Sequence, residues 1–197
     1  MTMADVLMPS AARRSVPTRW VAEIVLILGG SLVVALSAQA EIPLAFTRVP
    51  ITGQTFGVLL VGMALGSERG AAAMALYLVQ GAAGLPVFAG GGLGLTWLLG
   101  PTGGYLWSYP VAAWAVGRLA ERGWDRRPST TVLAMLAGNA LIYLFGLPWL
   151  ATFVGSDRVW MSGLLPFIPG DIVKVALAAA ALPGAWKLIG RVRALGD

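Results

Sequence analysis

The chain has 197 residues, of which 57% are hydrophobic and only 12% are charged, whereas about 25% are charged in ordinary soluble domains. Together with a mean hydropathy of +0.77, this composition excludes an ordinary soluble domain and indicates a single integral membrane domain. The absence of cysteine and histidine excludes disulfides, thiolate chemistry and the commonest metal ligand, and the net charge of +5 is expected to set membrane orientation rather than to bind nucleic acid.

Long runs without charge predict an all-α membrane protein with six transmembrane helices, because each crossing takes about 20 apolar residues. In chain order, the expected helices cover about 20–40, 51–66, 70–83, 103–119, 131–150 and 169–189. Residues 1–19 are expected to form a cytoplasmic tail, because they lack the charged–apolar–small order of a cleaved signal. Residues 20–197 then form one transmembrane domain.

Two of the connecting loops have an unusual composition. Residues 41–50 contain Pro43 and Pro50, which mark a loop on the outer face. Residues 84–102 belong to the string "GLPVFAGGGLGLTWLLGPTGGY", which is too rich in glycine for a regular helix. Because this loop is apolar without being helical, we expect it to fold against the helices, in a re-entrant manner.

The basic residues predict which side of the membrane each loop faces. Eleven of them lie at the two ends of the chain or in the loops after the second and fourth helices, against only Arg48 and Arg158 on the other face. The eleven are Arg13, Arg14, Arg19, Arg69, Arg118, Arg122, Arg126, Arg127, Lys187, Arg191 and Arg193. Because basic loops stay in the cytoplasm, both termini are expected to be cytoplasmic.

An acid and a base stand at the outer start of the sixth helix, in the string "PFIPGDIVKVALAAA" at residues 166–180. Asp171 and Lys174 are three residues apart, which places their side chains on one face of a helix. A structural explanation exists, since the helix dipole favours Asp there, Lys can reach the interface, and the pair can neutralise itself. The alternative is a binding site, because charges at membrane depth are costly and usually face a cavity. The ammonium would suit a ligand carboxylate, and the carboxylate would suit N–H donors.

Other polar side chains are predicted to lie in the same outer half. Gln54 is at the outer start of the second helix, Asn139 near the middle of the fifth, and Tyr143 one turn further out. Each amide could instead connect two helices, and Tyr143, like Trp97, is typical of an interfacial aromatic belt. The candidate substrate-binding residues are Gln54, Asn139, Tyr143, Asp171 and Lys174. No catalytic residue and no metal ligand are predicted.

Five strings, in order and spacing, resemble the BioY family, the biotin-specific substrate-binding subunits (S-components) of energy-coupling-factor (ECF) vitamin transporters. They are "VPITGQTFGVLLVGMALG", "GAAGLPVFAGG", "GPTGGYLWSYP", "GNALIYLFGLPWL" and "PFIPGDIVKVALA". The resemblance covers about residues 20–190. It implies the S-component fold, with six helices and an outward-opening pocket, in the cytoplasmic membrane of a prokaryote.

The resemblance also implies a ligand and partners. The ligand would be biotin, with no cofactor, and the partners would be a transmembrane coupling subunit and two cytoplasmic ATPases. The acid and base of the family's PGDxxK motif correspond to Asp171 and Lys174, and its outer-loop glutamine to Gln54. The chain departs from the family at the Ala-xxx-Ala motif of the first helix, where the nearest match is Ser31-xxx-Ala35.

Other functional classes fit the sequence less well. An intramembrane enzyme would need a nucleophile–base set or a metal cluster, and a purely structural subunit would not need two ionised groups beside amides. A stand-alone secondary transporter of biotin or another small carboxylated vitamin is the main alternative, although no internal repeat is visible. The chain has no Walker sequence, so any energy from ATP must come from another chain.

Overall fold

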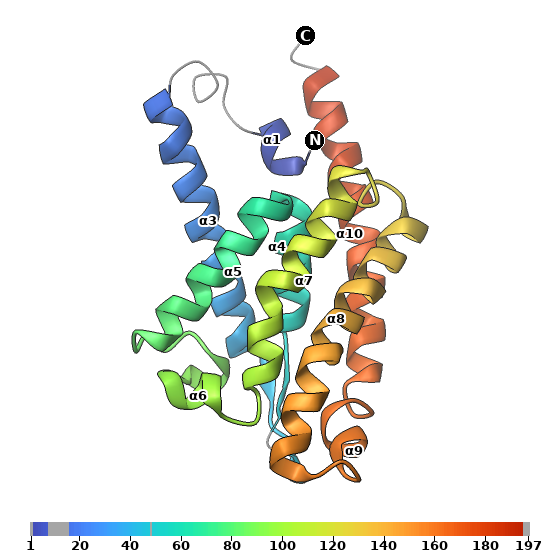
Figure 1. The fold of residues 1–197 in the computed structure, drawn as a ribbon. Helices are drawn as coiled ribbons and strands as arrows, with labels where there is room; N and C mark the ends of the chain where they lie inside the picture. The colour runs from blue at the N-terminus through green and yellow to red at the C-terminus, as the bar shows by residue number, and fades with distance from the viewer. Residues whose placement is uncertain (1, 8–15, 48, 195–197) are drawn as a thin grey trace.

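The structure, a computed structural model, describes residues 2–7, 16–47 and 49–194. Within these residues, six helices have twelve or more residues and form the body of the fold (Figure 1). They are α3 (Val16–Gln39), α4 (Gln54–Leu65), α5 (Ser67–Ala82), α7 (Gly103–Glu121), α8 (Pro128–Val154) and α10 (Ile168–Ala194). The shorter elements are α1 (Met3–Leu7), β1 (Glu41–Ile42), β2 (Ile51–Thr52), η1 (Ala89–Gly91), α6 (Leu95–Leu99) and α9 (Val159–Gly163).

The six predicted segments each correspond to one of the six long helices. The first begins at Val16, four residues before its expected start, so the end of the predicted tail is helical. Among the described residues, three stretches are long and apolar enough to cross a membrane: Val16–Gln39, Pro128–Val154 and Val159–Arg191. A membrane protein with at least these three spans is therefore supported. The helix α4 is apolar but has only 12 residues.

The loop at residues 84–102 was wrongly predicted to lack helix. Its segment "LTWLL" forms α6, because these five residues contain no glycine and can close helical hydrogen bonds. The turns that precede it use Gly90 and Gly94, whose φ angles of 59° and 81° lie in the left-handed region that favours glycine. The other predicted loop is closed by β1 and β2, which pair antiparallel with Glu41 opposite Thr52. Arg48, in the same loop, lies outside the described residues, as do Arg13 and Arg14.

Close helix packing forms the core, with α7 against α4, α5 and α8. Gly62 of α4 makes this contact possible, because a Cβ atom there would lie 2.6 Å from the carbonyl oxygen of Ala113 in α7. Gly66, with a φ of 92°, is the single residue between α4 and α5 and reverses the chain there. The helix α1, the start of α3 and the end of α10 lie at one end of the bundle, opposite α6 and α9 (Figure 1).

An ion cluster joins three elements at the end of the bundle that carries α1. Arg69 at the start of α5 lies 2.5 Å from Glu23 of α3 and 2.6 Å from Asp5 of α1. Burial alone would raise the pKa of Asp5, but the backbone N–H of Thr2 and the Arg69 guanidinium hold that pKa below its ordinary value. The cluster keeps α1 packed against the bundle, where Met3 and Ala4 are buried.

Candidate ligand-binding site

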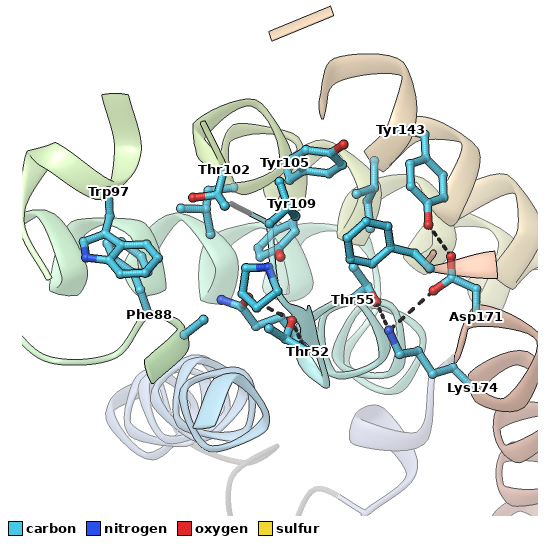
Figure 2. A pocket seen from close by; sticks show the side chains of 17 residues that line it. Thr52, Thr55, Phe88, Trp97, Thr102, Tyr105, Tyr109, Tyr143, Asp171 and Lys174 are labelled. Carbon is cyan, nitrogen blue, oxygen red and sulfur yellow. Dashed lines mark hydrogen bonds and ion pairs between the residues drawn. The ribbon is translucent and has the colours of Figure 1, made fainter. Parts of the chain in front are cut away.

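A pocket opens at the end of the bundle opposite α1, between β2, the start of α4, the glycine-rich loop, α7, α8 and α10. It encloses about 600 Å³ of space not filled by atoms, with the open solvent at its mouth included. Figure 2 shows Trp97 and Phe88 at one side of the pocket and Tyr143, Asp171 and Lys174 at the other. Its polar lining residues are Thr52, Gln54, Thr55, Thr102, Asp171 and Lys174, and its aromatic ones are Phe88, Trp97, Tyr105, Tyr109, Tyr143 and Phe167.

The acid and base at the start of α10 do not simply pair with each other. The ammonium of Lys174 donates to the hydroxyl of Thr55 at 2.8 Å, whereas its distance to the Asp171 carboxylate is 3.4 Å. Tyr143 of α8 donates from its hydroxyl to the other oxygen of Asp171. An ammonium has three donors, and partners in the described part of the chain use two of those of Lys174, which leaves one for a ligand. Both side chains are mostly buried, with exposed fractions of 16% for Lys174 and 12% for Asp171.

The amide of Gln54 lies at the first residue of α4 and is also buried. Its nitrogen donates to the hydroxyl of Tyr77 at 2.6 Å, and its oxygen accepts from the hydroxyl of Thr52 at 3.0 Å. The backbone N–H of Gln54 donates to the same Thr52 hydroxyl at 3.3 Å. The strand β2 and the first turn of α4 therefore present one connected set of polar groups to the pocket.

Four of the five predicted site residues line this pocket, namely Gln54, Tyr143, Asp171 and Lys174. Asn139 does not, because it lines an adjoining apolar groove between α8 and α10, together with Tyr143 and Asp171. Asn139 is one turn from Tyr143, about 6 Å along the helix axis. The long tyrosine side chain reaches Asp171, whereas the short amide has no side-chain hydrogen bond within the described part of the chain.

Several lining residues were not predicted from the sequence. Trp97 was assigned to an interfacial belt, but α6 places it in the pocket wall. Thr55 follows Gln54 directly, and its hydroxyl is the nearest hydrogen-bond partner of Lys174. Tyr105 and Tyr109 lie four residues apart within α7, which places both side chains on the face that meets the pocket. That spacing, and their place in the string "GPTGGYLWSYP", were the signals in the sequence that could have identified the two tyrosines.

Comparison with known proteins identifies the family. The model of the BioY family matches residues 8–191 of the chain. The chain belongs to the BioY family. The resemblance predicted from the five strings is thereby confirmed.

BioY relatives match most of the chain. It is 42% identical over 149 residues to a probable biotin transporter BioY of Pyrococcus horikoshii, covering 75% of this chain and 88% of that protein. It is 38% identical over 161 residues to a biotin transporter BioY of Rhizobium etli, covering 77% and 86%. Since these family members are transporters, the prediction that the chain is not an enzyme is confirmed.

A solved structure shares the fold. The crystal structure of the S-component for biotin from an ECF-type ABC transporter matches with a TM-score of 0.76 and 24% sequence identity. The match covers 88% of this chain and 95% of that one. The chain therefore has the fold of this S-component.

Proposed function

We propose that the chain binds biotin in the pocket beside Asp171 and Lys174 and is the substrate-binding subunit of an ECF-type transporter. The pocket supports this proposal most directly, because it combines a buried carboxylate, a buried ammonium and an aromatic wall. The family adds independent support, since its members include proteins named biotin transporters.

Biotin has chemical groups that match those of the pocket. Its ureido ring offers two N–H donors and a carbonyl acceptor, its thioether ring is apolar, and its valerate chain ends in a carboxylate. The carboxylate of Asp171 suits an N–H donor, and the free donor of Lys174 suits either the valerate or the ureido carbonyl. Phe88 and Trp97 suit the apolar ring. A buried polar group left unpaired would cost about 1–3 kcal/mol, which would discriminate against other vitamins.

The proposed topology has six transmembrane helices, with both termini on the cytoplasmic side and the pocket opening outward. The distribution of basic residues supports this orientation, and so does the position of α1 and the end of α10 at the end of the bundle away from the pocket (Figure 1). The protein would then be located in the cytoplasmic membrane of a prokaryote. In this arrangement α4, α5 and α7 also cross the membrane.

The proposed partners are a transmembrane coupling subunit and two cytoplasmic ATPases. The matching crystal structure is of a component of an ECF-type ABC transporter, and the present chain has no nucleotide-binding motif. Ser31 and Ala35, the nearest match to the family's first-helix motif, are both buried. Ser31 donates a hydrogen bond to Gln80 of α5, so we expect other residues of α3 to contact the coupling subunit.

Calorimetry of the full chain in detergent tests the ligand assignment. We expect the protein alone to bind biotin tightly and to show no binding of thiamine or riboflavin, which lack the ureido–valerate combination. Tight binding of another vitamin, with none of biotin, would show that the proposed ligand is wrong.

The loops at the pocket mouth are expected to become more ordered when biotin binds. Residues 41–52 and 84–102 both contribute lining residues, and glycines such as Gly90 and Gly94 allow the second loop to rearrange at low steric cost. Hydrogen exchange measured with and without biotin should slow in one or both loops. Amides within the core of α8 serve as the internal control and should not change. Equal exchange rates in both loops would exclude a lid at this position.

A further inference from the structure

Tyr77 lies behind the pocket and connects it to the glycine-rich loop. Its side chain on α5 is fully buried. Its hydroxyl donates to the backbone oxygen of Val87 at 3.0 Å and accepts from the amide nitrogen of Gln54 at 2.6 Å. Its ring meets Phe88 edge-on, with 5.4 Å between ring centroids, and stacks on Tyr109 at 6.5 Å. These contacts hold the hydroxyl in one place between the loop and α4.

The direction of these hydrogen bonds fixes the orientation of the Gln54 amide. A backbone carbonyl can only accept, so the single hydroxyl proton of Tyr77 is used by Val87. The tyrosine oxygen can then only accept from Gln54, which must turn its NH₂ group toward Tyr77. The amide oxygen is left beside Thr52, from which it accepts one hydrogen bond at 3.0 Å. Since a carbonyl oxygen has two lone pairs, it can accept one more hydrogen bond.

We propose that Tyr77 is a positioning residue that makes Gln54 an acceptor toward the pocket, and thereby selects a ligand with an N–H group at this point. The inference rests on the proposed function, because the ureido ring of biotin supplies such N–H groups. Without Tyr77, the amide could rotate by 180° and present its NH₂ group instead. It would then tolerate a ligand that carries an acceptor where biotin carries a donor. The same hydroxyl holds Val87, so the orientation of the amide and the position of the loop are linked.

The selectivity of the Tyr77→Phe variant tests the inference. Titrations would use biotin and its cyclic carbonate isostere, in which ring oxygens replace both ureido N–H groups. We expect the Kd for biotin to rise by roughly tenfold to a hundredfold, since two buried hydrogen bonds are lost, and the Kd for the isostere to change much less. The preference for biotin over the isostere should therefore fall. An unchanged preference would overturn the inference.

A double-mutant cycle separates this role from a purely structural one. If Tyr77 acts through Gln54, adding Tyr77→Phe to Gln54→Ala should weaken binding little beyond the single Gln54→Ala change. Fully additive losses would overturn the inference. Thr131→Val is the matched control, because Thr131 is a buried residue whose hydroxyl also makes two hydrogen bonds, to the backbone oxygens of Trp124 and Arg127. Thr131 lies outside the residues that line the pocket, so its variant should bind biotin like the wild type.

A measurement without ligand keeps the inference distinct from the proposed function. The chain has three glutamines, Gln39, Gln54 and Gln80, so ¹⁵N-glutamine labelling gives three side-chain amide signals, and Gln54→Ala assigns one of them. In the wild type, one amide proton of Gln54 should exchange slowly with water, and in Tyr77→Phe this protection should be lost. Equal protection in both proteins would refute the role of Tyr77. Absence of biotin binding by the wild type would refute the proposed ligand alone.

Discussion

Replacement of Asp171 by Asn, or of Lys174 by Met, is expected to raise the Kd for biotin by roughly ten- to a hundredfold. This range corresponds to the about 1.5–3 kcal/mol of a hydrogen bond to a charged group. The geometry supports an effect of this size, because Lys174 is bonded more closely to Thr55 than to Asp171 and both charges line the pocket. Titration of each single variant by calorimetry would measure the change.

The double variant distinguishes ligand binding from mutual neutralisation. If the two charges only neutralise each other, Asp171→Asn together with Lys174→Met should bind biotin almost like the wild type. If they bind the ligand, the double change should not restore affinity. Arg118→Met is a matched control, because Arg118 pairs with Glu121 three residues away at 3.3 Å, yet the pair lies outside the pocket. This control should bind biotin normally.

An analogue of biotin can then determine which ligand group Lys174 contacts. If the ammonium meets the valerate, Lys174→Met should discriminate less between biotin and its carboxyl-amidated analogue. If the ammonium meets the ureido carbonyl instead, the loss should be similar for both compounds.

Gly81→Ala is expected to weaken biotin binding by about tenfold or more while the helices remain folded. A Cβ atom at Gly81 would lie 2.0 Å from the tip of the Phe88 ring, so the ring must leave its place on α5. Phe88 is fully buried and lines the pocket, and its displacement would deform the wall. Overpacking of this kind costs about 1–3 kcal/mol. Titration with biotin and a thermal melt in detergent would measure the two effects separately.

A second change tests the proposed cause. Phe88→Leu in the Gly81→Ala background removes the ring atoms that clash, so the double variant should regain part of the lost thermal stability. Gly29→Ala is the control, because a Cβ atom there meets nothing within 4 Å. If Gly81→Ala bound and melted like the wild type, Phe88 would not be fixed by contact with Gly81.

The long helices were predictable because charges and glycines interrupt the apolar sequence at their ends. The local structure of the outer loops was not predictable in the same way. The strands β1 and β2 have two residues each, and their pairing depends on how α3 and α4 bring them together. The five residues of α6 are too few to form a helix on their own, so this helix depends on contact with α5 and α7.

The candidate site was predictable where charge was rare. Asp171 and Lys174 stand out because few ionised residues occur within the apolar segments. Thr55 and Tyr109 do not stand out, because hydroxyl and aromatic side chains are common in membrane helices, and only the neighbouring helices decide which face borders a cavity. Asn139 shows a different limit, since it lies one turn from Tyr143 on α8 but lines the adjoining groove instead of the pocket.

The short helix α4 also reduces the barrier between the pocket and the cytoplasm. Its 12 residues rise about 18 Å, whereas the hydrocarbon core of a bilayer is about 30 Å thick. Gln54, its first residue, lines the pocket, and Gly66 turns the chain just after its last. In the proposed orientation, a ligand held beside Gln54 has already passed about two fifths of the hydrophobic thickness before any partner acts. The coupling subunit and its ATPases would then have to open a path only along the about 18 Å that this helix spans.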